Sequence, residues 1–351
     1  MEQFNLAGSN TKLLIKDNVL AILSDKSLMT VSSAIFNGGF KKVKAVLNVG
    51  VPEGYNDRSL HLDPLNLITS SAAKLGLTED YLAMVTAAKI KNYSLVSKTA
   101  GIFSVSVAAT AGCSHGESSG EEMAVQEIAG TINIIVLIDG NPTESCMVAS
   151  LITATEAKSA ALRDFDVRSR YTGDSATGSI TDSVTIASTS QGKTINYGGP
   201  ASKLGKLVGY CTRRAVTEAL IKQEPIWACR TVLDRLKERH LPLEKLAAEL
   251  SKVDSLAVDE KALADILKNK PLATTYLLAA ARLDDDFKKN LLLAEFGDIS
   301  DLSRCFGIGA SSKKICSDVS KYDSVDLPPF LKHALINIVR EALDKGSTEK
   351  T

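Results

Sequence analysis

The feature that most constrains the fold is a change in the character of the sequence near Glu224-Pro225. Before this point Ser, Thr, Gly and Val are abundant, and the apolar residues switch between the period of a strand and that of a helix. After it Leu, Ala, Lys, Asp and Glu dominate, and almost every stretch has helical spacing. At about 150 residues per domain, a chain of 351 residues suits two domains. The pattern predicts an α/β domain over residues 1–228 and a mainly helical domain of unknown role over 229–351.

The first domain is expected to hold a mixed sheet with covering helices. Ile132–Ile138 is apolar at every position except Asn133. A strand that is apolar on both faces usually lies in the middle of a sheet covered by helices. Other strands are predicted over Lys12–Ile15, Val19–Leu23, Val43–Val49, Ser94–Val96, Ile102–Ala109 and Thr181–Ala187, and helices over Leu65–Leu75, Glu144–Leu162 and Leu204–Ile221. Asp17-Asn18, between the first two of these strands, is expected to form a hairpin-like turn.

The second domain is expected to be a set of helices separated by prolines. Breaks are expected at Pro242, Pro271 and Pro328-Pro329, because proline cannot continue a helix from within. The helices are predicted over Cys229–Arg239, Leu243–Ser251, Glu260–Lys268, Ala273–Leu283, Phe287–Ala294 and Leu331–Asp344.

Charge and targeting signals narrow the classes of partner. Lys plus Arg and Asp plus Glu number 41 each, and the balance holds on both sides of the composition change, so no basic footprint for nucleic acid is expected. Met1–Asn10 has neither a basic region nor an apolar core, so a secretory signal is not expected and the protein is predicted to be cytoplasmic. Thr99–Gly116 is too polar for a spanning helix, so membrane insertion is not expected either.

The cysteines and histidines do not predict a metal site. The six cysteines include no C-x-x-C pair, which favours reduced thiols in a cytosolic protein. The four histidines are far apart and have no zinc-ligand spacing. We therefore expect no bound metal.

Two polar positions stand out near the predicted central strand and the helix that follows it. Asn133, shortly after Thr131, needs hydrogen-bond partners if it is buried, and either a structural role or a ligand-facing role would supply them. In the helix, Glu156 lies on or beside a face of small residues, and Lys158 points about 160° away from it at ~100° per residue. A close helix–sheet contact with solvated charges and a ligand site both explain this helix.

Two later stretches combine glycines with hydroxyl or basic side chains. Tyr171–Asp182 presents backbone N–H groups and short donors suited to amide or oxyanion recognition, although a plain glycine-rich loop has the same composition. Its spacing is not that of a Walker A loop. Lys203 follows Ser202, a candidate N-cap whose helix start favours anionic or carbonyl oxygens, and capping alone also explains it.

The loop Thr110–Glu117 brings Cys113 and His115 close together in sequence. Adjacent Ser, His and acidic residues cannot form a hydrolase triad by sequence proximity alone. A surface histidine and a ligand-facing histidine are both compatible with this loop.

Together these stretches resemble the adenosylcobinamide amidohydrolase (CbiZ-type) family, in the family's order and over roughly residues 12–222. The resemblance implies a cytoplasmic corrinoid-salvage enzyme, which hydrolyses the amide between the aminopropanol arm and the corrin ring of adenosylcobinamide. The products are adenosylcobyric acid and 1-amino-2-propanol. The matching motifs are Ser32-Ser33-Ala34 with Gly38-Gly39, Thr110-Ala111-Gly112, Gly130-Thr131-Ile132-Asn133, Ala154-Thr155-Glu156-Ala157-Lys158, Ala176-Thr177-Gly178 with Thr181-Asp182, and Lys203-Leu204-Gly205 with Gly209.

Given that resemblance, the candidate residues can be assigned roles in amide hydrolysis, which needs an activated water, carbonyl polarisation and a proton for the leaving amine. Glu156 is the expected general base or acid, with Asp182 orienting it or sharing the role. Lys158 or Lys203 is expected to polarise the carbonyl. The corrinoid is the substrate, so no cofactor is expected, and assembly into a homo-oligomer is left open. The residues expected to bind the substrate are Thr131, Asn133, Thr177, Gly178, Thr181, Lys203 and His115.

Two departures from the family pattern keep other functions open. Cys113-Ser114-His115 replaces an Asn-containing continuation, and Ile180 stands where the family has a glycine. A non-catalytic corrinoid carrier or sensor would tolerate the change at Ile180. A scaffold protein that uses its helical half as an interaction surface is the other alternative.

Overall fold

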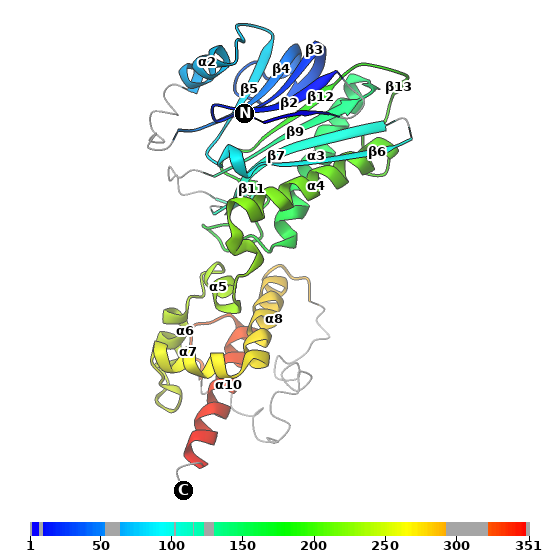
Figure 1. The fold of residues 1–351 in the computed structure, drawn as a ribbon. Helices are drawn as coiled ribbons and strands as arrows, with labels where there is room; N and C mark the ends of the chain where they lie inside the picture. The colour runs from blue at the N-terminus through cyan, green and yellow to red at the C-terminus, as the bar shows by residue number, and fades with distance from the viewer. Residues whose placement is uncertain are drawn as a thin grey trace. The chain divides into compact units, whose positions relative to one another are not determined.

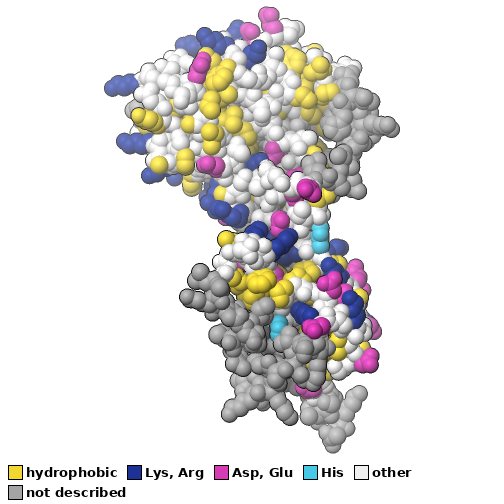
Figure 2. All heavy atoms as spheres, turned by 180° about the vertical axis from the view of Figure 1, so that it is seen from behind, with side chains coloured by type: hydrophobic (Ala, Val, Ile, Leu, Met, Phe, Trp, Pro, Cys, Tyr) yellow, Lys and Arg dark blue, Asp and Glu magenta, His cyan; other side chains and the backbone are white. Residues whose placement is uncertain are grey.

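A computed structural model of the chain describes residues 2–6, 10–52, 64–101, 103–114, 116–122, 130–292 and 322–348 (Figure 1). The chain divides into two compact units, residues 1–229 and 230–351. The first holds a mixed sheet with helices and the described part of the second is helical, so the predicted fold class is confirmed. The surface is mixed in character, with basic, acidic and apolar side chains interspersed on the face seen in Figure 2.

The first unit is built on one nine-stranded sheet. Its order is β1-β2-β3-β12-β9-β7-β6, and β4 joins at β3 and is followed by β5. The predicted hairpin at Asp17-Asn18 is confirmed, and both residues have positive φ, as a two-residue turn between twisted strands requires. The strands are β1 (Glu2–Asn5), β2 (Thr11–Lys16), β3 (Val19–Ser32), β4 (Gly39–Gly50), β5 (Tyr81–Thr86), β6 (Ser94–Ala100), β7 (Phe103–Gly112), β9 (Thr131–Asp139) and β12 (Ser183–Ser188).

The long β3–β4 ribbon divides this sheet into two halves that pack against each other. The first part of β3 pairs with β2 and its last part pairs with β12, and the β3–β4 register shifts between Leu23 and Leu28. Such a bulge bends and twists a ribbon. Side chains of β5, such as Met84, therefore share one buried cluster with Ile135 and Leu137 of β9.

Helices cover the outer faces of the two halves. Ile134 and Val136 of β9 pack with α3 (Glu144–Asp164) and α4 (Lys203–Gln223). On the other half, α2 (Pro64–Lys74) packs on β4 and β5 (Figure 1). The predicted covering helices are thus present, but only one face of β9 is covered by them. Its other face is apolar because the second half of the sheet covers it.

Four short strands form two separate two-stranded sheets. β8 (Gly116–Glu117) pairs antiparallel with β11 (Gly178–Ser179), and β10 (Asn141–Pro142) pairs parallel with β13 (Thr194–Ile195). The first pair joins two of the motif-bearing loops to each other.

The second unit packs its helices around leucines such as Leu246, Leu277 and Leu335. The separate helix predicted over Phe287–Ala294 is wrong where the structure describes it, because α8 continues unbroken to Lys288 and Asn290 has positive φ. No helix in the described ranges is long and apolar enough to cross a bilayer. The helices are α5 (Val232–Lys237), α6 (Leu243–Leu250), α7 (Glu260–Asn269), α8 (Pro271–Lys288) and α10 (Pro329–Thr348).

Candidate active site

The motif-bearing segments meet at one end of the central strands. β7 ends at Gly112, directly opposite Thr131 at the start of β9. β12 begins at Ser183, opposite Asn133 in the parallel β9 ladder. Because β7 runs against β9 and β12 runs with it, the end of one strand and the starts of two others lie together. The loop that carries Asp182 enters the sheet at this point.

A buried ion pair between Lys158 and Asp182 is the centre of this region. Lys158 projects from the inner side of α3, and its Nζ lies 2.5 Å from Oδ2 of Asp182. The two side chains are only 9% and 13% exposed. A buried ammonium without a partner would destabilise the fold, so the ion pair is what allows both charged side chains to be buried.

Asp182 is held by three further hydrogen bonds. Its Oδ1 accepts from the backbone N–H of Ile132 (3.0 Å) and from Oγ of Ser179 (2.5 Å). Its Oδ2 accepts from the backbone N–H of Ser179 (3.1 Å) in addition to Lys158. The carboxylate is therefore fixed in position by the loop and by β9.

Gly178 leaves room for the pair. A Cβ at this position would lie 2.5 Å from Oδ2 of Asp182 and 2.9 Å from Nζ of Lys158. Ile180, by contrast, does not have positive φ, so glycine is not needed at that position of the loop. The departure at Ile180 leaves the backbone around Asp182 unstrained.

Two threonines tie the loop to the start of β9. Oγ1 of Thr131 and Oγ1 of Thr181 are 2.9 Å apart, and Thr181 also donates to the carbonyl of Gly130 (3.1 Å). Both predicted residues therefore lie next to Asp182.

Asn133 projects from the opposite face of β9, between the two halves of the sheet. It is 1% exposed, and its Nδ2 donates to Oδ1 of Asn48 (2.8 Å) and to the carbonyl of Val85 (2.9 Å). Its Oδ1 has no donor among the residues that the structure describes. These contacts match the structural alternative and place Asn133 away from the Lys158 side.

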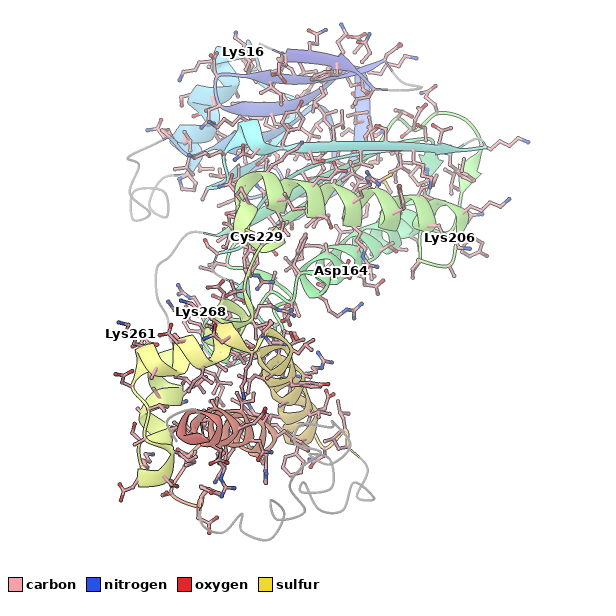
Figure 3. All side chains as sticks on the ribbon, turned by 60° about the horizontal axis from the view of Figure 1, so that its bottom comes forward. Lys16, Asp164, Lys206, Cys229, Lys261 and Lys268 are labelled. Carbon is pink, nitrogen blue, oxygen red and sulfur yellow. The ribbon has the colours of Figure 1, made fainter. Side chains whose placement is uncertain are left out.

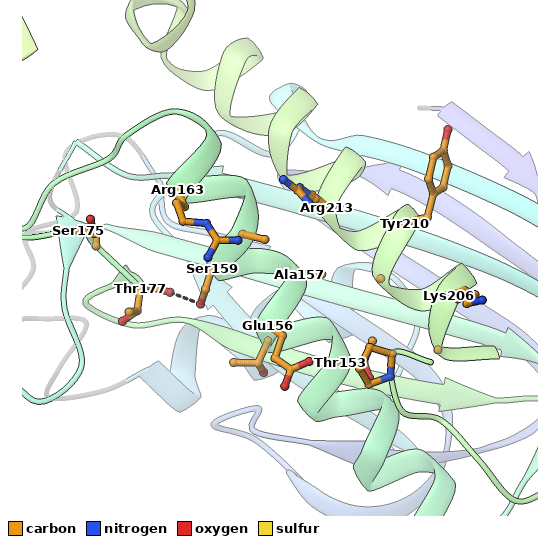
Figure 4. A pocket seen from close by; sticks show the side chains of 16 residues that line it. Thr153, Glu156, Ala157, Ser159, Arg163, Ser175, Thr177, Lys206, Tyr210 and Arg213 are labelled. Atoms are coloured by element: carbon orange, nitrogen blue, oxygen red, sulfur yellow. Dashed lines mark hydrogen bonds between the residues drawn. The ribbon is translucent and has the colours of Figure 1, made fainter. Parts of the chain in front are cut away.

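Glu156 is exposed and lies on a different side of α3 from Lys158. It lines a groove of about 860 Å³ between α3, α4 and the loop at Thr177 (Figure 4). The groove also holds Ser159, whose Oγ donates to the Thr177 carbonyl (2.8 Å). The structure therefore does not bring Glu156 together with Asp182.

The remaining predicted residues lie elsewhere. Lys203 is exposed in the first turn of α4, which Ser202 caps by accepting from the Gly205 N–H (2.9 Å). The other basic residue of that turn, Lys206, lines the groove and is labelled in Figures 3 and 4. His115 lies outside the described residues.

The loop after β7 carries Cys113, and Glu224, which follows α4, holds this loop. Cys113 is buried, with Sγ 3.9 Å from the Gly178 carbonyl. Burial raises the pKa of its thiol and the charges of Asp182 and Glu224 raise it further, with Lys158 opposing, so Cys113 stays a thiol. Glu224 accepts from the backbone N–H groups of Cys113 and Ser114, at 3.2 Å each. An acidic residue before a proline gave no sign of this contact.

The chemistry available here is that of a fixed ammonium beside a fixed carboxylate. A buried ammonium can stabilise negative charge on a carbonyl oxygen, and a carboxylate can take a proton from water. Within the described ranges, no cluster of three or more His, Cys, Asp or Glu side chains could hold a metal ion.

Comparisons with known proteins point to one family. The model of the family described as adenosylcobinamide amidohydrolase matches residues 6–227. An adenosylcobinamide amidohydrolase of Methanosarcina mazei is 30% identical over 213 residues, which are 59% of this chain and 92% of the relative. The uncharacterized protein MJ1613 of Methanocaldococcus jannaschii is 29% identical over 210 residues, 54% of this chain and 81% of the relative. The crystal structure of the PH0078 protein from Pyrococcus horikoshii matches 61% of this chain and 82% of its own, at 12% identity and a TM-score of 0.32.

Proposed function

Because the chain belongs to the adenosylcobinamide amidohydrolase family, we propose that it hydrolyses the amide between the aminopropanol arm and the corrin ring of adenosylcobinamide. The products would be adenosylcobyric acid and 1-amino-2-propanol, a reaction that serves corrinoid salvage. The observation that carries the proposal is the buried Lys158–Asp182 pair, on which three of the motif segments converge.

In this proposal Lys158 polarises the scissile carbonyl. Negative charge develops on the carbonyl oxygen when water adds, and a preorganised ammonium in a site with little water stabilises that charge. Asp182 holds the ammonium in place and takes the proton of the attacking water. The hydrogen bonds from Ile132 and Ser179 support this by keeping the carboxylate in one orientation.

Substrate contacts are proposed around this pair. Thr131 and Thr181 would offer hydroxyl groups to the amide-fringed rim of the corrin, and Gly178 would let the loop backbone lie directly beside the ion pair. Thr177 and Glu156 would contact the same ligand from the groove, so Glu156 would bind rather than transfer a proton.

The direct test is to incubate the purified full chain with adenosylcobinamide and to measure both products by mass spectrometry. We expect Lys158→Met and Asp182→Asn each to lower turnover by about 10²–10⁴-fold, the usual contribution of such groups. Lys261→Met, which changes an exposed lysine of α7, is the matched control and should turn over like the parent.

The assay also separates the enzyme from the alternatives. Retention of adenosylcobinamide without release of 1-amino-2-propanol would support a carrier or sensor. No retention at all would contradict both corrinoid functions.

A further inference from the structure

The proposed reaction needs one more group than the ion pair supplies. An amine leaves a tetrahedral intermediate as a neutral molecule only if its nitrogen receives a proton. In the proposed function Lys158 stabilises the oxyanion and Asp182 receives the proton of water. The acid that serves the leaving nitrogen has therefore still to be identified.

We infer that Glu117 is this acid, and that Glu121 keeps the proton on it; the inference rests on the proposed function. Glu117 belongs to β8 and lies directly opposite Gly178 of β11 in an antiparallel pair. Directly opposed residues of such a pair project from the same face. The Cβ direction of Gly178 points at Asp182 and Lys158, so Glu117 projects on the side of the ion pair.

Glu121 is an acceptor committed to three donors. Its carboxylate accepts from the Ser118 backbone N–H (2.8 Å), from Oγ of Ser169 (2.7 Å) and from Oγ1 of Thr172 (2.6 Å). These donors lower the pKa of the Glu121 carboxyl group, which keeps its negative charge beside Glu117. Its neighbour Glu117 has no comparable set of hydrogen-bond donors among the described residues. The Glu117 side chain is 17% exposed, and its Oε1 lies 3.8 Å from Nε of Arg170.

The two environments move the two pKa values apart. Burial raises the pKa of Glu117, the charge of Glu121 raises it further, and Arg170 opposes both. Burial alone would raise the pKa of Glu121, but the hydrogen bonds from Thr172, Ser169 and Ser118 lower it overall. Neighbouring carboxyl groups with diverging pKa values are typical of an acid and its charged partner.

Further charged and titratable groups lie within electrostatic reach on the other side. The charges of Glu117, Asp182 and Lys158 all act on the thiol of Cys113, which places Glu117 in the same electrostatic field as the ion pair. Glu121 and Arg170 are the charged groups that act on the protonation of Glu117 itself.

In the proposed reaction Asp182 accepts one proton and Glu117 gives one. The water oxygen forms a bond to the amide carbon, and its proton goes to Asp182. The C–N bond then breaks, its electron pair stays on nitrogen, and Glu117 gives that nitrogen its proton. The new carboxylic acid releases its proton to solvent, Asp182 loses its proton to solvent, and solvent reprotonates Glu117.

The test compares the pH profiles of three variants with that of the parent. Glu117→Gln should lower the rate of 1-amino-2-propanol release by about 10²–10⁴-fold and remove the fall in rate at high pH. Glu121→Gln should remain active, and its rate should fall at a lower pH than that of the parent, because the charge that raises the pKa of Glu117 is gone. Glu122→Gln, which changes an exposed neighbour, should match the parent.

A leaving-group experiment distinguishes proton donation from a structural role. The p-nitroanilide of adenosylcobyric acid releases an amine that needs little protonation, so Glu117→Gln should cost less than about tenfold on this probe. An equal loss on both substrates, or a parent-like rate on adenosylcobinamide, would overturn the assignment of Glu117.

A second variant keeps the assignment testable if Glu117→Gln does not fold, as its melting curve would reveal. Glu117→Asp should retain the fall in rate at high pH, and the absence of that fall would also overturn the assignment. A parent protein that releases no aminopropanol would instead overturn the proposed function.

Discussion

Gly178 lies directly against the carboxylate of Asp182, and a Cβ on Gly178 would be only 2.5 Å from Oδ2 of Asp182. The same Cβ would lie 2.9 Å from Nζ of Lys158. Only glycine therefore fits at this position of the loop, beside the ion pair. This relationship ties the backbone of one motif to the charges of two others.

Gly178→Ala should displace the ion pair. We expect the free energy of unfolding to fall by about 1–3 kcal/mol, which is the usual cost of overpacking a filled interior. Turnover should fall by at least about tenfold, because the ammonium of Lys158 would no longer be in position to polarise the scissile carbonyl. The measurements are a urea titration and the product assay. Gly199→Ala is the matched control, since a Cβ there meets no atom within 4 Å, and it should be silent in both.

Glu156→Gln should change substrate binding and leave the chemical step almost intact. The Glu156 carboxylate faces the groove between α3 and α4, whereas Lys158 on the same helix faces Asp182. We expect KM to rise and kcat to stay within about threefold of the parent. Steady-state kinetics beside a melting curve test this. A fall in kcat of about 10²–10⁴-fold in a stable protein would assign proton transfer to Glu156 after all.

The sequence predicted local features better than it predicted contacts between distant segments. The turn at Asp17-Asn18 and the cap at Ser202 depend on neighbouring residues alone, and both are confirmed. Helical spacing correctly separated Glu156 from Lys158, but it could not say which of them faces the sheet. That choice depends on Asp182, whose position follows from the parallel pairing of β9 and β12.

The face-to-face packing of the sheet was also beyond the sequence. Ile132–Ile138 has the apolar character of a strand covered on both faces, and helices and strands can cover a face equally well. The register shift between Leu23 and Leu28, which accompanies the division of the sheet, lies in a stretch without glycine or proline. No local signal marked it.

In the second unit, Asp284 should make stability depend on pH. Burial raises its pKa to about 6, although it accepts hydrogen bonds from the backbone N–H groups of Phe330 and Leu331. A carboxyl group whose pKa is raised in the folded state contributes its full stabilisation when the pH is below its pKa in the unfolded state, near 4. This contribution is lost as the pH rises through about 6. The effect should be on the order of 3 kcal/mol.

Hydrogen exchange of the amides at the start of α10 checks this prediction. Protection should fall between pH 4 and pH 6.5, after correction for the intrinsic exchange rate. Asp284→Asn should flatten this dependence, whereas Asp265→Asn, at an exposed site on α7, should keep it. Equal dependence in the parent and in Asp284→Asn would rule out Asp284 as its source.

Glu224→Ala should release the loop that follows β7. The Glu224 carboxylate accepts from the backbone N–H groups of Cys113 and Ser114, so its removal leaves both donors without their acceptor. We expect iodoacetamide to modify Cys113 at least about tenfold faster in the variant, because the thiol is buried in the parent. Peptide mass spectrometry measures this, with exposed Cys229 as the reactive reference and buried Cys146 as the protected one. Faster modification of Cys146 as well would mean general unfolding, and an unchanged rate at Cys113 would show that Glu224 does not hold the loop.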